Sequence, residues 1–390
     1  MPHQYKDPIN GKESSVGPQI ITSYFLRQAL TELRKEQFFT QLAHAQSIPP
    51  NYGKTIKRFH YMPILDDRNV SDEGIDATGA KIANGNLYGS SRDIGTVPGK
   101  LPVLGENGGR VNRVGVTRLE LEGTFEKFGF FTEYTRDSLN FDSDADLLMH
   151  INRELLTAAN QITEDALGID LINNAGTIRY AGEATSRATI GQGDIVTYVD
   201  LMRLAIDLDN NRVPKHTTIL TGTRNIDTRV IPAARYMYVG SEMIPTLRAM
   251  VDLHQNPAFI SAEHYAAGTT LAQGEIGQID QFRIIVNPYM SFWQGGGATL
   301  ESGDDAIYYN NGTNYDVLPM LVVGDEAFAT ITFQTSGNTV KFEINHKKPG
   351  DNIDRLDPYG ETGFISIRWF YGFMALRPER IALVLTAAKM

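Results

Sequence analysis

The chain has 390 residues, of which 42% are hydrophobic and 21% are charged, with no Cys and a formal net charge of -10. These values are typical of a folded protein with two or three domains, and they exclude disulfides, thiolate metal sites and cysteine nucleophiles. The negative charge disfavours tight nucleic-acid binding, which depends on clustered Lys and Arg. Without a signal peptide or a membrane-length apolar run, we expect a soluble protein that is not secreted.

The N-terminal third is expected to form an arm, a helix and a loop between strands. Residues 1–16 are polar and unpatterned, which predicts an extended arm. Residues 18–45 carry apolar side chains near one face of a predicted helix, namely Ile21, Phe25, Ala29, Leu33 and Leu42. Residues 54–64 and 114–134 are rich in β-branched and aromatic residues and are expected to be strands. The Gly-rich connection of residues 66–110 is too long for an ordinary loop, so we expect a two-stranded extension ordered by a neighbouring molecule.

The longest helical signal spans residues 144–176. Its apolar residues recur every three or four positions and are Leu148, Ile151, Leu155, Ala159, Ile162, Ala166, Ile169 and Ile172. Acidic and hydroxyl side chains at 142–144 favour its start, and Asn173, Asn174 and Gly176 favour its end. A helix of roughly 30 residues is about 45 Å long. We expect it to be a spine whose whole apolar stripe is buried, so that Ile162→Asp causes misfolding.

In the rest of the chain, predicted helices and strands alternate irregularly, which predicts the α+β class. Residues 194–209 are expected to form a helix, residues 226–250 a mixture of short helical runs around Pro232 and Pro245, and residues 294–315 a surface loop. Strands are expected at 217–221, 277–287, 318–323, 363–374 and 381–385, and a pair of strands within 325–346.

Two sequence motifs suggest ligand binding but lack essential residues. Gly53-Lys54-Thr55 resembles the end of a phosphate-binding loop, yet the Gly required five positions earlier is Ile48. Asp142, Asp144 and Asp146 resemble the start of a calcium loop, yet its sixth and twelfth positions are not Gly and Glu. A turn and helix capping, respectively, explain them better. The eight His residues show no zinc-binding spacing.

No catalytic, cofactor-binding or metal-binding residue is therefore predicted, and no cofactor is expected. Adjacent acids and His, at Glu263-His264 and at Glu343 with His346, arise by chance at this composition. An enzyme with a site built from distant carboxylates is the weakest alternative, with Asp304, Asp305, Glu326 and Glu343 as its candidates. Aromatic residues at 125–134 and 369–373, near Arg136 and Arg368, are expected to pack in cores and interfaces rather than stack on bases.

Several segments together carry a resemblance to a known family. They are GKTIKRF (53–59), FGFFTEYTRDSL (128–139), DALGIDLINNAGT (165–177), GEIGQIDQFRIIVNP (274–288) and DPYGETGFISIRWFYGFMALRPERI (357–381). The chain resembles major capsid proteins of tailed bacteriophages with the Hong Kong 97-type fold, most closely the family typified by the coliphage N-four coat protein. The last two segments are the most specific.

The resemblance implies a subunit divided into five parts. These are an N-terminal arm and helix (1–52), an extended loop with flanking strands (53–135), the spine helix of a peripheral domain (136–175), an axial domain (176–330) and strands that return to the peripheral domain (331–390). It also implies a structural virion protein, not an enzyme, that is assembled in the host bacterial cytoplasm. No cross-linking pair is carried over, because no motif for one is present.

The partners implied are first of all further copies of the chain, as pentamers and hexamers of an icosahedral shell around double-stranded DNA. The DNA would be contacted weakly and non-specifically, no membrane would be bound, and scaffold, portal and decoration proteins are candidate partners. Because the chain starts at Met1, we expect any scaffold to be a separate protein. An encapsulin-like compartment shell is the alternative. Deleting residues 75–105 is expected to leave a folded subunit that does not close shells.

Overall fold

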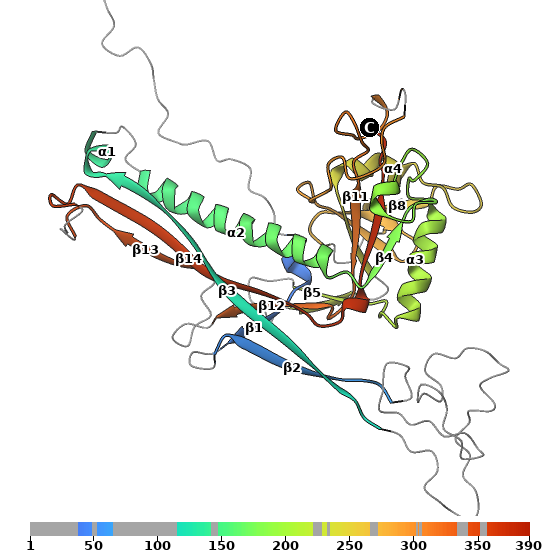
Figure 1. Ribbon diagram of the computed structural model, residues 1–390, viewed down its shortest axis with the longest axis horizontal. Coiled ribbons are helices and arrows are strands. Elements are labelled where there is room, and N and C mark those ends of the chain that lie inside the picture. The colour runs from blue at the N-terminus through green and yellow to red at the C-terminus, as the bar shows by residue number, and fades with distance from the viewer. Residues whose placement is uncertain are drawn as a thin grey trace, which may run out of the picture.

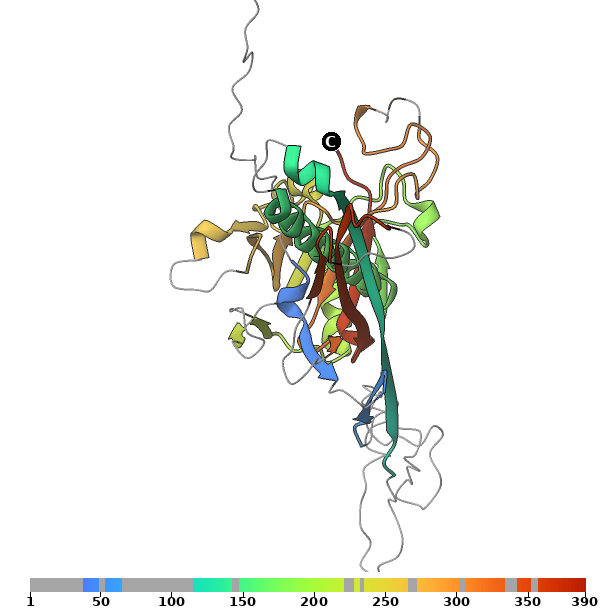
Figure 2. The same cartoon turned by 90° about the vertical axis from the view of Figure 1, so that its left-hand side faces the viewer.

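The computed structural model describes residues 38–48, 53–64, 115–141, 147–220, 228–231, 235–265, 272–301, 303, 306–333, 342–351 and 357–390. Within these ranges two β-sheets pack against different parts of one long helix, α2 (Leu147–Asn173). Figure 1 shows α2 above the longest strands at one end and beside a second sheet at the other, while a two-stranded ribbon leaves the body on the opposite side. Figure 2 shows the same ribbon extending away from the rest of the chain.

The first sheet is built around two long antiparallel strands, β3 (Arg118–Thr135) and β14 (Thr362–Ala375). Its order is β1-β12-β14-β3-β2, and β13 also pairs with β14. The other members are β1 (His44–Ile48), β2 (Thr55–Tyr61), β12 (Phe328–Phe333) and β13 (Phe342–Lys347). Apolar and polar residues alternate along β3 and β14, which is typical of strands that are covered on one face only.

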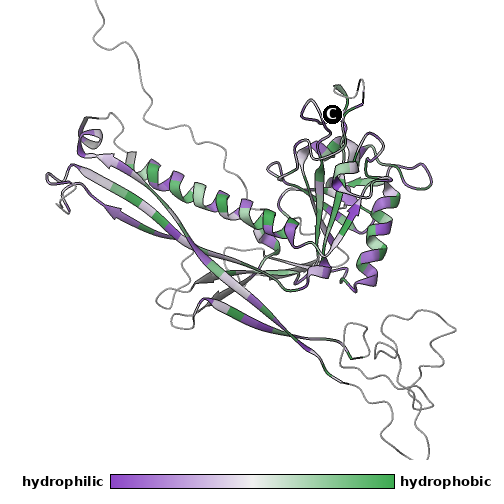
Figure 3. Ribbon diagram, viewed as in Figure 1, coloured by the Kyte–Doolittle hydropathy of each residue, from purple (hydrophilic) through white to green (hydrophobic). Residues whose placement is uncertain are grey.

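The second sheet has seven strands in the order β4-β15-β11-β7-β10-β9-β8. They are β4 (Thr177–Tyr180), β7 (Arg235–Val239), β8 (Phe259–Ser261), β9 (Glu275–Ile279), β10 (Phe282–Val286), β11 (Leu318–Val323) and β15 (Ile381–Thr386). Every residue of β7, β10, β11 and β15 is buried. These continuous apolar runs are typical of strands covered on both faces, and Figure 3 shows them as a mainly hydrophobic centre.

Helices cover both faces of the second sheet. One face packs against α3 (Tyr198–Asn210) and α4 (Ile244–Arg248), and the other packs against Phe38, Phe39 and the C-terminal half of α2. The start of α3 is fixed by a capping box, in which Thr197 and Asp200 satisfy each other's backbone N–H groups. The described residues also form two short helices, α1 (Arg136–Phe141) and α5 (Ala262–Tyr265), and a separate hairpin of β5 (Thr217–Leu220) and β6 (Thr228–Ile231).

The helix α2 buries different faces along its length. In its N-terminal half Leu155 and Ala159 pack against Ile365, Ile367 and Trp369 of the first sheet. In its C-terminal half the buried residues are Glu164, Leu167, Gly168, Leu171 and Ile172, which lie on another side of the helix. Ile162 and Ile169 continue the predicted stripe but are each 49% exposed. The expectation that the whole stripe is buried is therefore wrong, because the first sheet covers only its first half.

Most expected elements are present, including α2, α3 and the strands at 55–61, 118–135, 217–220, 318–323, 362–375 and 381–386. Residues 275–286 form a hairpin of β9 and β10 rather than a single strand. Within 226–250 the sequence analysis missed β6 and β7, and within 325–346 it predicted the wrong partner, because β12 and β13 both pair with β14. The end of the expected helix 18–45 is instead a 3-10 turn, Thr40–Leu42, followed by β1.

The C-terminal strands divide between the two sheets. β14 pairs with β3, β12 and β13 in the first sheet, whereas β15 pairs with β11 and β4 in the second sheet. The described residues of 294–315 form no helix or strand of the named set, as expected for a loop, but Tyr308 and Tyr315 are buried edge to face and Tyr308 bridges to Lys389. The arm 1–16, most of helix 18–45, the loop 66–110 and Asp142, Asp144 and Asp146 lie outside the described residues.

Candidate inter-subunit contact surfaces

The ribbon of β2 and the first part of β3 is the most prominent candidate contact surface. Residues 55–61 pair with residues 118–124, from Thr55 opposite Thr124 to Tyr61 opposite Arg118. Pairing of β3 with β14 begins only at Phe125. Among the described strands, this part of the ribbon pairs only within itself, so each of its two strands has an outer edge that no other described strand covers.

One face of the ribbon combines compensated charges with exposed aromatic rings. Lys57 forms ion pairs with Glu120 and Glu122, which raise the pKa of the Lys57 ammonium group. The Arg118 guanidinium lies 4.2 Å from the centroid of the Phe59 ring. Phe59 is 47% exposed and Tyr61 is 60% exposed. The opposite charges on this face neutralise one another locally. The rings of Phe59 and Tyr61 are therefore the main groups on this face that a partner could contact.

The opposite face of the ribbon continues a small core. Ile56 and Leu121 pack against Phe125, Ile331 and Met374. Gly123 permits this packing, since a Cβ atom there would lie 2.5 Å from Cδ1 of Ile331. The base of the ribbon is therefore fixed to the first sheet by side-chain packing.

The first sheet also has an exposed face on the side away from α2. Phe131 is exposed there, and Arg368 donates from Nε to a Glu343 carboxylate oxygen at 2.7 Å, with a second contact from its Nη2 atom. These bonds hold the pKa of Glu343 below its usual range. Arg368 thus has a carboxylate partner on this face.

The pairs of acids and His do not form acid–base sites. Glu343 and His346 lie three residues apart on β13 and point to opposite faces, because side chains alternate along a strand. The ring Nε2 of His346 lies 2.5 Å from the hydroxyl oxygen of Tyr134, whose pKa is raised by burial. Glu263 and His264 are exposed on the short helix α5.

The two described members of the set of distant carboxylates are not brought together. Glu326 lies on the turn between β11 and β12 near Arg377, and Glu343 lies in the first sheet with Arg368. Asp304 and Asp305 are outside the described residues. Across the described ranges, no group of three or more His, Asp or Glu residues is arranged to hold a metal ion. Gly53 has a φ of +83° and lies two residues before the start of β2.

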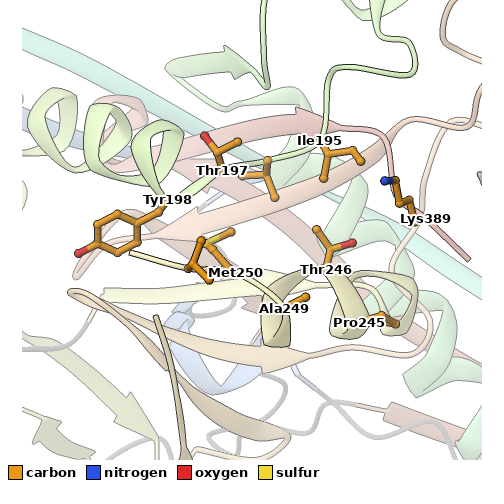
Figure 4. A pocket seen from close by; sticks show the side chains of 10 residues that line it. Ile195, Thr197, Tyr198, Pro245, Thr246, Ala249, Met250 and Lys389 are labelled. Carbon is orange, nitrogen blue, oxygen red and sulfur yellow. The ribbon is translucent and has the colours of Figure 1, made fainter. Parts of the chain in front are cut away.

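A pocket of about 440 Å³ lies between the start of α3 and α4, beside Lys389 (Figure 4). It is lined mainly by apolar groups, from Ile195, Val196, Thr197, Tyr198, Pro245, Thr246, Ala249, Met250, Val251 and Lys389. The hydroxyl of Thr197 is used in the capping box of α3. The pocket holds no carboxylate or imidazole, so its lining provides no acid–base pair for catalysis.

Sequence reasoning missed one buried polar contact that fixes the N-terminal segment on α2. Glu164 is 7% exposed and accepts hydrogen bonds from the backbone N of Phe39 at 2.5 Å and from the hydroxyl of Thr40 at 2.5 Å. The hydroxyl of Tyr238 donates to the carbonyl oxygen of Phe38 at 2.8 Å. Burial raises the pKa of Glu164 despite these hydrogen bonds. Glu164 does not belong to the predicted apolar stripe of α2, so no sequence pattern marked it as buried.

The chain was compared with known proteins. The model of a family described as phage capsid protein matches residues 118–384. The major capsid protein of Pseudomonas phage KPP21 is 59% identical over 390 residues, which cover 100% of this chain and 98% of that protein. The chain belongs to the phage capsid protein family. The resemblance noted from the sequence is thereby confirmed, and this capsid protein is a structural protein of the virion rather than an enzyme.

Solved capsids share the fold of this capsid protein. The capsid of Ralstonia phage GP4 matches with a TM-score of 0.63 and 12% identity, over 96% of this chain and 98% of that chain. The capsid asymmetric unit of cyanophage Pam1 matches with a TM-score of 0.54 and 9% identity, over 97% and 99% of the two chains. At such low identity these matches show the fold, which is the α+β Hong Kong 97-type fold of tailed-phage capsids.

The remaining alternatives are resolved by the same comparisons. The capsid protein is a phage major capsid protein, and nothing in them supports an encapsulin-like compartment. None of the helices in the described ranges combines the length and apolar character needed to cross a membrane.

Proposed function

We propose that this capsid protein assembles into pentamers and hexamers that form an icosahedral phage head around double-stranded DNA. The observation that carries the proposal is the ribbon of β2 and β3, which extends from the body, pairs along residues 55–61 and 118–124 with no further described strand, and carries the exposed rings of Phe59 and Tyr61. Such a ribbon is marginal in water by itself. Contacts between different surfaces of successive copies generate closed rings, and they would cover the ribbon.

The proposed subunit has the five parts 1–52, 53–135, 136–175, 176–330 and 331–390. The separate cores of the two sheets support a division into a peripheral part with α2 and the first sheet, and an axial part with the second sheet. Because β15 pairs with β11 in the second sheet, we include residues 381–386 in the proposed axial part.

The proposed contact with DNA is weak and non-specific. A net charge of -10 supports this, because strong phosphate binding needs clustered positive charge and would impede movement of the packaged DNA. Scaffold, portal and decoration proteins are candidate partners, and assembly would take place in the cytoplasm of the host bacterium. Nuclease-resistant double-stranded DNA inside purified particles would support the packaging role, whereas particles from infected cells that never contain DNA would contradict it.

The ribbon's role is tested with two matched double variants. Phe59→Ser with Tyr61→Ser removes both exposed rings, and we expect folded subunits that do not form closed shells in electron microscopy and sedimentation. Phe59→Tyr with Tyr61→Phe keeps both rings and is expected to form shells. The thermal unfolding midpoint of unassembled subunits should be the same in both, because neither ring is in the core. Shells of normal yield from the serine variant would refute the role given to this face.

A further inference from the structure

The pocket between α3 and α4 is an apolar hollow on the surface of the second sheet's covering helices. Its volume of about 440 Å³ is within the range of ligand-binding pockets. In Figure 4 the side chains of Tyr198 and Lys389 mark its two ends. The apolar surface continues beside it, through the exposed side chains of Val199, Val251 and Leu253. An exposed apolar surface of this kind is typical of a contact with another molecule.

The loop after β10 carries two exposed aromatic rings. Tyr289 is 45% exposed and Phe292 is 43% exposed. Their neighbours Met290 and Trp293 pack in the core between the second sheet and α2. The backbone of Trp293 also exchanges two hydrogen bonds of 3.0 Å with the backbone of Val317. The two rings are therefore presented by a loop that is fixed to the body of the subunit.

The topology places the pocket and the two rings at the same end of the second sheet. β7, β10 and β15 run in the same direction, because β10 is parallel to β7 and β11 is antiparallel to both β7 and β15. The pocket is lined by residues that follow the carboxyl ends of β7 and β15, and the rings follow the carboxyl end of β10.

The pocket and the rings nevertheless lie on opposite faces of this sheet. Val196 and Met250 of the pocket pack in the core on the face of α3 and α4, whereas Met290 and Trp293 pack on the face of α2. Figure 1 shows α3 and α2 on opposite sides of the second sheet. Two different surfaces on opposite sides of a subunit, at the same end, can meet between successive copies of a closed ring.

The charged groups beside the two surfaces are opposite in sign. Lys389 is exposed and lines the pocket. Asp165 of α2 lines the small hollow that is also lined by Tyr289. An aromatic ring flanked by a carboxylate is complementary to an apolar pocket with an ammonium group at one end. We propose that the Tyr289 and Phe292 rings of one copy pack into this pocket of the next copy within a pentamer or hexamer.

This inference rests on the proposed assembly, and it names two surfaces that meet in it. The absence of Cys from the chain allows a direct cross-linking test. In the variant Phe292→Cys with Ala249→Cys, each subunit carries one cysteine on the loop and one in the pocket. Mild oxidation of shells of this variant should therefore close disulfide-linked rings, which migrate at the masses of pentamers and hexamers in non-reducing electrophoresis.

The matched control pairs Phe292→Cys with Ile178→Cys. Ile178 is also exposed, but it lies on the edge strand β4 opposite Leu383, whose side chain packs on the α2 face. This variant should give no cross-linked rings. Intact shells of the loop and pocket variant that give no cross-link between subunits would overturn the inference. A faster-migrating monomer would also contradict it, because the two positions would then meet within one subunit.

Filling the pocket provides a second test that needs no cysteine. Ala249 is exposed in the pocket, so Ala249→Trp should leave the thermal unfolding midpoint of unassembled subunits unchanged. It should raise the protein concentration needed to form shells at least about tenfold, because loss of an aromatic anchor typically weakens a contact by that factor. Ala249→Ser keeps the pocket open and should assemble like the wild type.

The outcome separates this inference from the proposed function. Equal assembly of the Ala249→Trp and Ala249→Ser variants into intact shells would overturn the inference alone. Failure of the wild type to form shells would contradict the proposed function, and the inference with it.

Discussion

The two sheets of this capsid protein differ in how completely the chain covers them. The seven-stranded sheet has helices on one face, α2 and the Phe38–Phe39 segment on the other, and four fully buried strands. The first sheet is covered by α2 over part of one face, and it leaves Phe131 and the ribbon exposed. The second sheet is thus stabilised within the subunit, whereas the first sheet keeps apolar surface that no described part of the chain buries.

The largest expected effect is a loss of stability in the second sheet. Leu383→Ala on β15 removes a side chain that is buried in the core and should lower the free energy of unfolding by about 2–5 kcal/mol. Its neighbour in the parallel register, Ile178 on the edge strand β4, is exposed. Ile178→Ala should lower the free energy of unfolding by less than about 0.5 kcal/mol. Denaturant unfolding of unassembled subunits measures both, and equal losses would contradict the contrast drawn here.

A smaller effect is expected where α2 binds the N-terminal segment. Glu164→Leu leaves the backbone N–H groups of Phe39 and Thr40 without their acceptor. This should lower the free energy of unfolding by about 1–3 kcal/mol at every pH. Glu164→Gln keeps an acceptor for them and a donor for the Thr40 hydroxyl, and it should remain folded. Denaturant unfolding at several pH values separates the two variants.

The same site predicts a pH dependence with a definite sign. The pKa of Glu164 is raised by burial, so its protonated form is favoured in the folded state. Its stabilising contribution is therefore fully present below the pKa of the unfolded chain and is lost as pH rises through the higher folded value. Relative to wild type, Glu164→Gln should gain stability as the pH is raised from acid to neutral. A difference that is constant with pH would show that Glu164 does not titrate as proposed.

The smallest effect is expected on the exposed half of the α2 stripe. Ile162→Asp should change the stability of the folded body by no more than about 0.5 kcal/mol, because the side chain is half exposed and the charge stays hydrated. Leu155→Asp places the same charge in the buried half and should prevent folding. Circular dichroism of the two variants checks this. Misfolding of Ile162→Asp would restore the original expectation of a fully buried stripe.

The sequence was informative wherever local patterns decide the structure. The periodicity of residues 147–173 predicted α2, and the alternating residues of 118–135 and 362–375 predicted β3 and β14. Family-specific segments at 274–288 and 357–381 gave the fold and the biological role. Periodicity alone did not reveal which half of the α2 stripe is covered, because that depends on how far the first sheet extends along the helix.

Other features depend on contacts between residues distant in the sequence. β7 was missed because it begins with Arg235, a residue type that is rarely buried without partners. Arg235 is fully buried and donates to the carbonyl of Val213 and to Asp209, both at 2.6 Å, and to Gln281 at 2.8 Å. The contact of Glu164 with Phe39 spans 125 residues in the sequence. No local sequence pattern predicts such a contact.

The strand β3 is continuous from Arg118 to Thr135, although its partner changes from β2 to β14 near Phe125. The ribbon is therefore not joined to the body by a flexible linker. Its base is fixed by the packing of Leu121 and Phe125, while Tyr134, near the far end of the same strand, packs in the core beneath α2. A force applied to the ribbon acts on β3 as on a lever, and it delivers torque to the sheet on which α2 rests.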